Sequence, residues 1–243
     1  MAPRYHLREG IVVRRSELPS GDVVVTVLGL SGKWRGVARK GKLLGGNLAR
    51  LSLFHEVSVQ GYRKRDDDLL LITQVELSGA LPALSQPALY PYAHLLAELA
   101  EQLAVDQAGE RLYAYLVSGL RGLVQHHDPE AVALVISWRL VQQAGLAPRL
   151  TRCARCGGGP CRRFDIAAGG LTCDRCASGL PIAEAAKAEL LAMLTKAVRE
   201  TLSEPLLERP THWALLSRYL AFHVGSLNSL GHLGAVTSWP PSS

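Results

Sequence analysis

The chain has 243 residues, of which 48% are apolar and 20% are charged, and its net charge is +6. That length suits one large domain or two to three small ones, and the composition excludes a largely disordered chain. No apolar run approaches the roughly 18 residues that a membrane span needs. The first residues carry charge early and contain no apolar signal core, so we expect a cytoplasmic protein.

The positive charge is unevenly distributed along the chain. Residues 1–80 hold 13 Lys/Arg against 8 Asp/Glu, and residues 151–182 hold 5 against 2. Residues 81–150 hold 4 against 6, and residues 183–243 are balanced at 5 each. This asymmetry predicts a polyanionic partner, nucleic acid first. An ordinary solvated basic surface is the alternative interpretation.

The first 80 residues have the composition of β-strands. Gly10–Val13 is apolar and β-branched, and Asp22–Leu30 is nearly all Val, Thr and Leu. Three further strands are predicted at Lys33–Arg39, Phe54–Tyr62 and Leu69–Leu77. They are separated by turn residues, and only a short helical turn is expected, around Asn47–Leu53. Five strands joined by short turns predict a small closed barrel.

Helical periodicity replaces this pattern after a proline-rich break at Gly79–Pro91. Apolar residues at helical spacing predict helices within 93–103 and 112–123. Asp128-Pro129-Glu130 predicts the start of a third helix, with Asp128 as N-cap and proline in the first turn. Further segments are predicted beyond the cysteines: helical structure at Ala183–Leu202 and Pro210–Val224, then a loosely held tail at Gly225–Ser243.

All five cysteines lie between residues 153 and 176. Cys153-x2-Cys156 and Cys173-x2-Cys176 form two close pairs, a spacing that can place four thiolates around one Zn²⁺. Nearby arginines would offset part of the negative charge of such a site: Arg152, Arg155 and Arg175. Four sulfur ligands leave no open position for water, so we expect one structural zinc ion that holds together a segment too short for its own core.

Two alternatives concern the same cysteines. Disulfides compete with zinc, but they are rare in cytosolic proteins and an odd number of cysteines leaves one over. Cys161 is a spare thiol in our interpretation, although it could replace Cys156 or Cys173 as a ligand.

Basic residues gather on the predicted barrel. Lys33, Arg35 and Arg39 alternate with uncharged residues along one strand, so period-two geometry places the three cations on one face. The same patch extends to Arg14 and Arg15 after the first strand, to Lys40 and Lys42 in the following loop, and to Arg63, Lys64 and Arg65 at a hairpin tip. We expect these ten residues to bind the phosphate backbone of DNA.

Two aromatic residues of the barrel could stack on bases, Trp34 and Tyr62. The face of Trp34 also holds small residues, which favours a place in the core for this side chain.

Catalytic motifs are not found. Gly36-x4-Gly41-Lys42 resembles a phosphate-binding loop, but Leu43 stands where Ser or Thr must hold Mg²⁺. We therefore expect a protein that is not an enzyme.

The order of these parts resembles the RecO family of bacterial DNA repair and recombination mediators. Five segments carry the resemblance: Glu9–Arg15, Gly36–Gly41, Leu51–Phe54, Leu71–Leu77 and Gly145–Gly157. It covers about residues 5–225. The turn Glu17–Asp22 departs from the family pattern, and the C-terminal tail has no counterpart in it.

The resemblance implies an OB-fold barrel that binds single- and double-stranded DNA, anneals complementary strands without ATP and helps to load recombinase onto coated single strands. The implied partners are the single-stranded DNA-binding protein, through its acidic C-terminal tail, and the mediator RecR. It also implies that Cys153, Cys156, Cys173 and Cys176 are zinc ligands. Such a protein would be cytoplasmic and associated with the nucleoid.

The expected fold is therefore α+β and multidomain, with an N-terminal OB-fold β-barrel and an all-helical domain that contains an inserted four-cysteine zinc finger. The expected boundaries are 1–80 for the DNA-binding barrel, 81–150 and 183–243 for the two helical parts with the tail, and 151–182 for the zinc finger. The alternative function is a generic zinc-ribbon and OB-fold binder of nucleic acid, acting on RNA or in transcription. A zinc enzyme is the more distant alternative.

Overall fold

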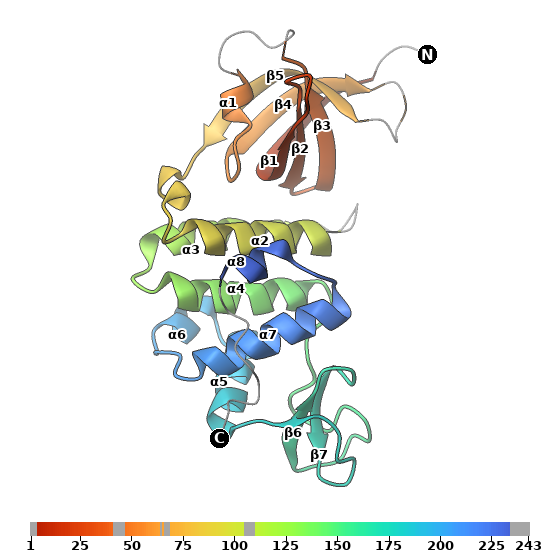
Figure 1. The fold of residues 1–243 in the computed structure, drawn as a ribbon, viewed down its shortest axis with the longest axis vertical. Helices are drawn as coiled ribbons and strands as arrows, with labels where there is room; N and C mark the ends of the chain where they lie inside the picture. Colours follow the sequence, from red (N-terminus) through yellow and green to blue (C-terminus); the bar gives the residue numbers. More distant parts are fainter. Residues whose placement is uncertain (1–3, 41–46, 64, 66–68, 105–109, 234–243) are drawn as a thin grey trace. The chain divides into compact units, whose positions relative to one another are not determined.

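The computed structural model describes residues 4–40, 47–63, 65, 69–104 and 110–233. The chain divides into two compact units, residues 1–125 and 126–243. The first unit contains a β-barrel and several helices, and the second contains the remaining helices and a small sheet (Figure 1). Among the helices of the described residues, none is long and apolar enough to cross a membrane.

The barrel of the first unit has five strands: β1 (Arg4–Glu17), β2 (Val23–Gly29), β3 (Gly32–Ala38), β4 (Glu56–Arg63) and β5 (Leu70–Gly79). They close in the order β1-β2-β3-β5-β4. Neighbouring strands are antiparallel except β3 and β5, which pair in parallel over Gly36–Ala38 and Leu70–Ile72. A short helix, α1 (Asn47–Arg50), lies between β3 and β4. The predicted five-stranded closed barrel is confirmed.

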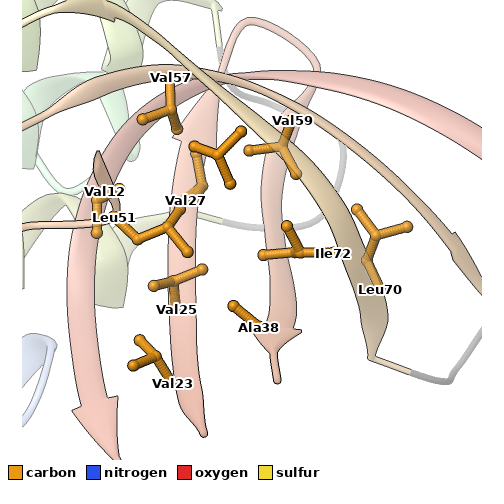
Figure 2. Packing of buried hydrophobic residues seen from close by; sticks show 11 residues of the cluster. Val12, Val23, Val25, Val27, Ala38, Leu51, Val57, Val59, Leu70 and Ile72 are labelled. Carbon is orange, nitrogen blue, oxygen red and sulfur yellow. The ribbon is translucent and has the colours of Figure 1, made fainter. Parts of the chain in front are cut away.

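Alternate residues of these strands fill the interior of the barrel. Figure 2 shows this apolar cluster, which consists of Val12, Val23, Val25, Val27, Ala38, Leu51, Val57, Val59, Leu70, Ile72 and Val75. Trp34 packs against the cluster, as the small residues on its face indicated. Because side chains alternate across a strand, the neighbours of these strand residues point away from the interior. On β1 and β2 some of these outward residues are also buried, such as Ile11, Thr26 and Leu28.

Gly10 lies where β1 changes partner from β4 to β2. Its φ angle is +153°, and a Cβ atom at this position would lie 2.3 Å from the carbonyl oxygen of Leu28. Only glycine tolerates so close an approach of two backbones. Gly10 therefore allows the long strand β1 to pair with both β4 and β2.

After a short 3₁₀ helix (Pro82–Ser85), the first unit ends with α2 (Tyr90–Leu103) and α3 (Glu110–Gln125). The described part of the second unit contains five helices: α4 (Pro129–Gln143), α5 (Glu184–Thr195), α6 (Val198–Leu202), α7 (Arg209–His223) and α8 (Asn228–His232). Asp128 caps α4, since its carboxylate accepts a hydrogen bond of 3.1 Å from the amide of Ala131. The predicted start of this helix is confirmed.

Two details of the second unit differ from the sequence-based expectation. The helical segment predicted at Ala183–Leu202 consists of two helices with a break at Lys196-Ala197. The buried guanidinium of Arg139 donates to the carbonyl oxygens of Leu194 and Lys196, which releases these groups from helical bonding and ends α5. The segment expected to be a loose tail contains α8, whose Leu230 is buried.

The cysteine-rich segment folds around three strands that the sequence did not suggest: β6 (Cys161–Asp165), β7 (Gly170–Cys173) and β8 (Leu180–Pro181). They form a sheet in the order β7-β6-β8. Phe164 of β6 packs edge-on against Tyr219 of α7, with ring centroids 6.1 Å apart. The imidazole Nε2 of His223 lies 2.8 Å from the carbonyl oxygen of Ile166. These contacts hold the sheet against α7.

Candidate metal centre and nucleic-acid interface

Four cysteine side chains converge beside this small sheet. The sulfur atoms of Cys153, Cys156, Cys173 and Cys176 all lie within 4.8 Å of one another. Those of Cys156 and Cys173 are 3.6 Å apart, and none of the five cysteines forms a disulfide. A tetrahedral zinc site with Zn–S bonds of about 2.3 Å has sulfur–sulfur edges of about 3.8 Å. The donor set and its spacing therefore fit one divalent metal ion.

Two tight turns aim these sulfurs at a common point. In the first, the amide of Gly157 donates to the carbonyl oxygen of Cys153 at 2.9 Å, and Gly157 has a φ angle of +74°. In the second, the amide of Cys176 donates to the carbonyl oxygen of Cys173 at 3.1 Å. Because β7 ends at Cys173, the strand fixes where the second turn begins.

Backbone amides also favour thiolates in the first pair. The amide of Cys156 donates to the sulfur of Cys153 and lowers the pKa of that thiol to about 6. The amide of Gly158 and the guanidinium of Arg175 lower the pKa of Cys156. A hydrogen bond with the Cys156 side chain, together with burial, raises the pKa of Cys176 to about 12. A divalent cation would take the place of that last proton.

Cys161 lies beside this group but is not one of its four members. It is the register partner of Cys173 across β6 and β7, and its sulfur lies 3.6 Å from the carbonyl oxygen of Gly158. Burial raises the pKa of its thiol. Among the arginines expected to offset thiolate charge, Arg175 contacts Cys156, whereas Arg155 binds the carboxylate of Asp165 at 2.8 Å.

The predicted DNA-binding cations of the barrel fall into three groups. The first consists of exposed residues on or just after β3, namely Arg35, Arg39 and Lys40. Among the described residues, the side chains of Arg35 and Arg39 form no hydrogen bond or ion pair. They remain available to an external anion.

The second group is bound to other parts of the first unit. The guanidinium of Arg14 contacts the carboxylate of Glu101 on α2 at 2.7 Å, and the Lys33 ammonium donates to the backbone carbonyl of Glu101 at 2.9 Å. Arg15 lies 3.8 Å from the carboxylate of Glu17. The first two residues therefore join β1 and β3 to the end of α2.

The third group lies at the hairpin between β4 and β5. Arg63 is half-buried and Arg65 is exposed. Lys64, together with Lys42 of the loop after β3, lies outside the described residues.

The sequence of this chain matches a known protein family. Residues 84–231 match the family model described as "Recombination protein O C terminal". This match spans more than half of the chain and includes all five cysteines. The chain belongs to the RecO family.

RecO proteins of known sequence resemble this chain over most of its length. A protein named "DNA repair protein RecO" from Streptomyces avermitilis is 33% identical over 234 residues, which cover 89% of this chain and 93% of that relative. Another with the same name, from Thermobifida fusca, is 31% identical over 230 residues, covering 89% and 92%. The resemblance inferred from ordered sequence segments is thus confirmed.

Among solved structures, an asparaginyl-tRNA synthetase from Pyrococcus horikoshii aligns with 51% of this chain and 31% of its own. The TM-score is 0.29 and the sequence identity is 13%. This likeness carries no argument about the RecO barrel or its function.

The RecO barrel also carries an aromatic pair that the sequence suggested only in part. Tyr5 and Tyr62 are direct partners across β1 and β4, and their ring centroids are 5.9 Å apart. The sequence offers Tyr62 as a residue that could stack on bases. Tyr5 could not be recognised as its partner, because nothing local in the sequence shows that strands separated by almost 60 positions pair with each other.

Proposed function

We propose that this chain acts in DNA repair and homologous recombination by binding single- and double-stranded DNA through its barrel. It anneals complementary strands without ATP and helps to load recombinase onto coated single-stranded DNA, and none of these steps requires it to catalyse a reaction. Membership of the RecO family supports the role in repair and recombination. We also propose the domain boundaries predicted from the sequence, in which residues 1–80 form the DNA-binding domain.

The observation that carries the proposal is a pair of unengaged cations, Arg35 on β3 and Arg39 immediately after it. Arg35 and Arg39 are exposed, and Val37 lies between them on the same face. Two guanidinium groups on one strand face can bind neighbouring phosphates. Lys40 extends the same basic surface beyond the strand.

Annealing follows from the electrostatics of such a surface. Two complementary strands repel each other through their phosphates, and bound cations reduce this repulsion while counterions are released. Phosphate contacts carry no sequence information, so the strands can shift until their bases are in register. Base pairing then supplies the free energy, which removes the need for nucleotide hydrolysis.

The cofactor we propose is one structural Zn²⁺ held by Cys153, Cys156, Cys173 and Cys176. The spacing of the four sulfur atoms supports this assignment, as does the preference of zinc for four thiolates in structural sites. When bound, the ion would join the two turns that flank the small sheet. The proposed protein partners are RecR and the single-stranded DNA-binding protein, both taken from the family.

The first experiment measures annealing of two complementary oligonucleotides, each precoated with single-stranded DNA-binding protein, without ATP. We expect rapid formation of duplex with the unmodified chain and much slower annealing with the Arg35→Glu/Arg39→Glu variant. The matched control is Arg111→Glu/Arg199→Glu, which makes the same change of charge at exposed positions outside the barrel.

Three results would count against parts of the proposal. Binding to naked DNA without annealing of coated strands would leave a generic nucleic-acid binder. A preference for RNA at equal salt would favour a role in RNA or transcription processes. Unchanged DNA affinity in the Arg35→Glu/Arg39→Glu variant would place the DNA site elsewhere.

A further inference from the structure

We propose that Tyr5 and Tyr62 form a stacking surface for unpaired bases, so that the barrel binds single-stranded DNA through base contacts as well as phosphate contacts. This inference rests on the proposed DNA binding by β3. The additional ligand is the unpaired base of a single strand. The two residues that would bind it lie outside the basic patch.

The register of the barrel places the two tyrosines in a continuous row with the basic strand. Val37 of β3 pairs with Leu71 of β5, and Leu71 pairs with Tyr62 of β4. Tyr62 in turn pairs with Tyr5 of β1. All four positions lie on the outer face, because the residues that alternate with them point into the barrel or toward its interior side.

Arg35 on β3 and Arg39 immediately after it flank this row, each two residues from Val37. Alternation along β3 places Arg35 on the same face as Val37. Adjacent strands are about 4.8 Å apart, so the row from β3 to β1 spans roughly 14 Å. A single strand whose phosphates contact β3 could thus reach the tyrosines with its bases. The arginines would bind the phosphates of the single strand, and the tyrosines would contact its bases.

Tyr5 is exposed outside the core, and Tyr62 beside it is half-buried. The side chain of Tyr5 is 75% exposed, and its ring is inclined by 54° to that of Tyr62. Leu7, on the same face, is 59% exposed. Exposed aromatic rings beside a basic surface are the arrangement on which successive bases stack in proteins that bind single strands.

Carboxylates on the outer face of the barrel lie away from the two tyrosines along β1 and β4. From Tyr5 and Tyr62, the outer face continues to Leu7 and Gln60, which are uncharged register partners. It then reaches Glu9, whose partner Ser58 pairs with Glu76 of β5. These carboxylates repel phosphates, so a bound strand is expected to avoid the end of the face at Glu9 and Glu76.

Stacking on these residues requires bases that are not already stacked in a duplex. The contact therefore distinguishes single-stranded from double-stranded DNA, whereas Arg35 and Arg39 bind both. Trp34, the other aromatic residue considered on the barrel, packs against the core cluster and is not available for this role.

The test compares the Tyr5→Leu/Tyr62→Leu variant with the unmodified full-length chain in binding to oligothymidine and to duplex DNA. We expect affinity for oligothymidine to fall roughly 5- to 150-fold for each stacked base, while duplex affinity changes by less than about twofold. The dependence of affinity on salt should keep its slope, because no phosphate contact is removed. Photo-cross-linking with 5-iodouracil oligonucleotides should map to residues 5 and 62.

Two control variants keep the test interpretable. Tyr5→Phe/Tyr62→Phe retains the rings and should bind oligothymidine like the unmodified chain. Phe222→Leu removes an exposed aromatic ring from α7, outside the barrel, and should have no effect.

Equal binding of oligothymidine by the leucine variant and the unmodified chain, with cross-links elsewhere, would overturn the stacking surface and leave phosphate binding intact. If the unmodified chain bound neither form of DNA, the proposed function itself would fail. The two failures are therefore distinguishable.

Discussion

The barrel and the four-cysteine segment are both small β structures, but different interactions hold them together. The barrel encloses a cluster of eleven buried apolar residues, contributed by all five strands and by Leu51. The segment around β6–β8 buries few large apolar side chains, notably Phe164 and Leu171, and brings four sulfur atoms together instead. A short chain can thus replace an apolar core with a cross-link through one ion.

Metal removal tests this comparison with the largest expected effect. Structural zinc contributes about 10 to 16 kcal/mol to the folding of small zinc-dependent peptides at neutral pH. We expect a strong chelator, or Cys153→Ser, to abolish slow hydrogen exchange in residues 150–182 and to leave the exchange of the barrel unchanged. Hydrogen-exchange mass spectrometry together with metal analysis measures both.

Cys161→Ser is the matched control for the metal prediction, since this thiol is not among the four converging sulfur atoms. It should retain one metal ion per chain. Unaltered exchange of residues 150–182 after complete loss of metal would show that apolar packing alone holds the segment.

Truncation of a core side chain tests the barrel in the same way that metal removal tests the four-cysteine segment. Ile72 is 1% exposed and belongs to the apolar cluster. Ile72→Ala should lower the free energy of unfolding of the barrel by about 2 to 5 kcal/mol, because it removes buried carbon and leaves a cavity. Denaturant unfolding measures the change, and metal content should stay the same. Leu18→Ala, at a 41% exposed position, serves as the control. An equal loss in both variants would contradict an interior held by packing.

Loss of an ion pair in the second unit is expected to lower stability by less than truncation of a core side chain does. Arg209 binds the carboxylates of Asp128 and Glu130, with Nη1–oxygen distances of 3.1 and 2.9 Å. Burial raises the pKa of Asp128, but the Ala131 amide and the Arg209 guanidinium outweigh it and leave the pKa below its ordinary value. Asp128→Asn keeps an N-capping oxygen and removes the charge. We expect it to lower stability by about 1 to 2 kcal/mol at pH 7.

The pH dependence of this difference has a defined sign. A carboxyl group with a lowered pKa in the folded state stabilises the fold above its unfolded pKa, about 3.9, and this contribution is lost as the pH falls through the folded value. The difference between the two chains should therefore be complete at pH 6 to 7 and shrink below about pH 4. Unfolding curves at several pH values, with Asp174→Asn as an exposed control, measure it. A difference that grew in acid would contradict the assignment.

The smallest expected effect on stability belongs to the surface of the barrel. Arg35→Glu/Arg39→Glu alters exposed side chains that have no partner among the described residues. We expect the free energy of unfolding to change by less than about 0.5 kcal/mol for each substitution, whatever happens to DNA affinity. A large loss of stability would mean that these cations serve the fold.

Local sequence patterns predicted the elements of the barrel better than their partners. The alternation of Val23, Val25 and Val27 fixes which side of β2 faces the barrel interior, and every expected strand is present. Patterns of this kind carry no information on which strands pair. The parallel pairing of β3 with β5 and the meeting of Arg14 with Glu101, 87 positions apart, depend on tertiary structure.

The cysteine spacing predicted the candidate metal centre, because two close pairs suffice to bring four sulfurs together. The three strands between and after the pairs were missed, since β6 and β7 are short and carry cysteine, arginine and glycine in place of alternating apolar residues. The break between α5 and α6 was also not predictable, because its cause, Arg139, lies 55 residues before Leu194 in the sequence.

The parallel pairing of β3 with β5 has a consequence for the order in which the barrel folds. β1, β2 and β3 are neighbours in sequence and form antiparallel ladders, so they can assemble as soon as they leave the ribosome. The seam between Gly36–Ala38 and Leu70–Ile72 must wait for about thirty further residues and for closure of a long loop. Until then the outer edge of β3 offers unpaired backbone groups to other chains. Closure of this seam is expected to be the late, rate-limiting event in barrel folding and the step most exposed to aggregation.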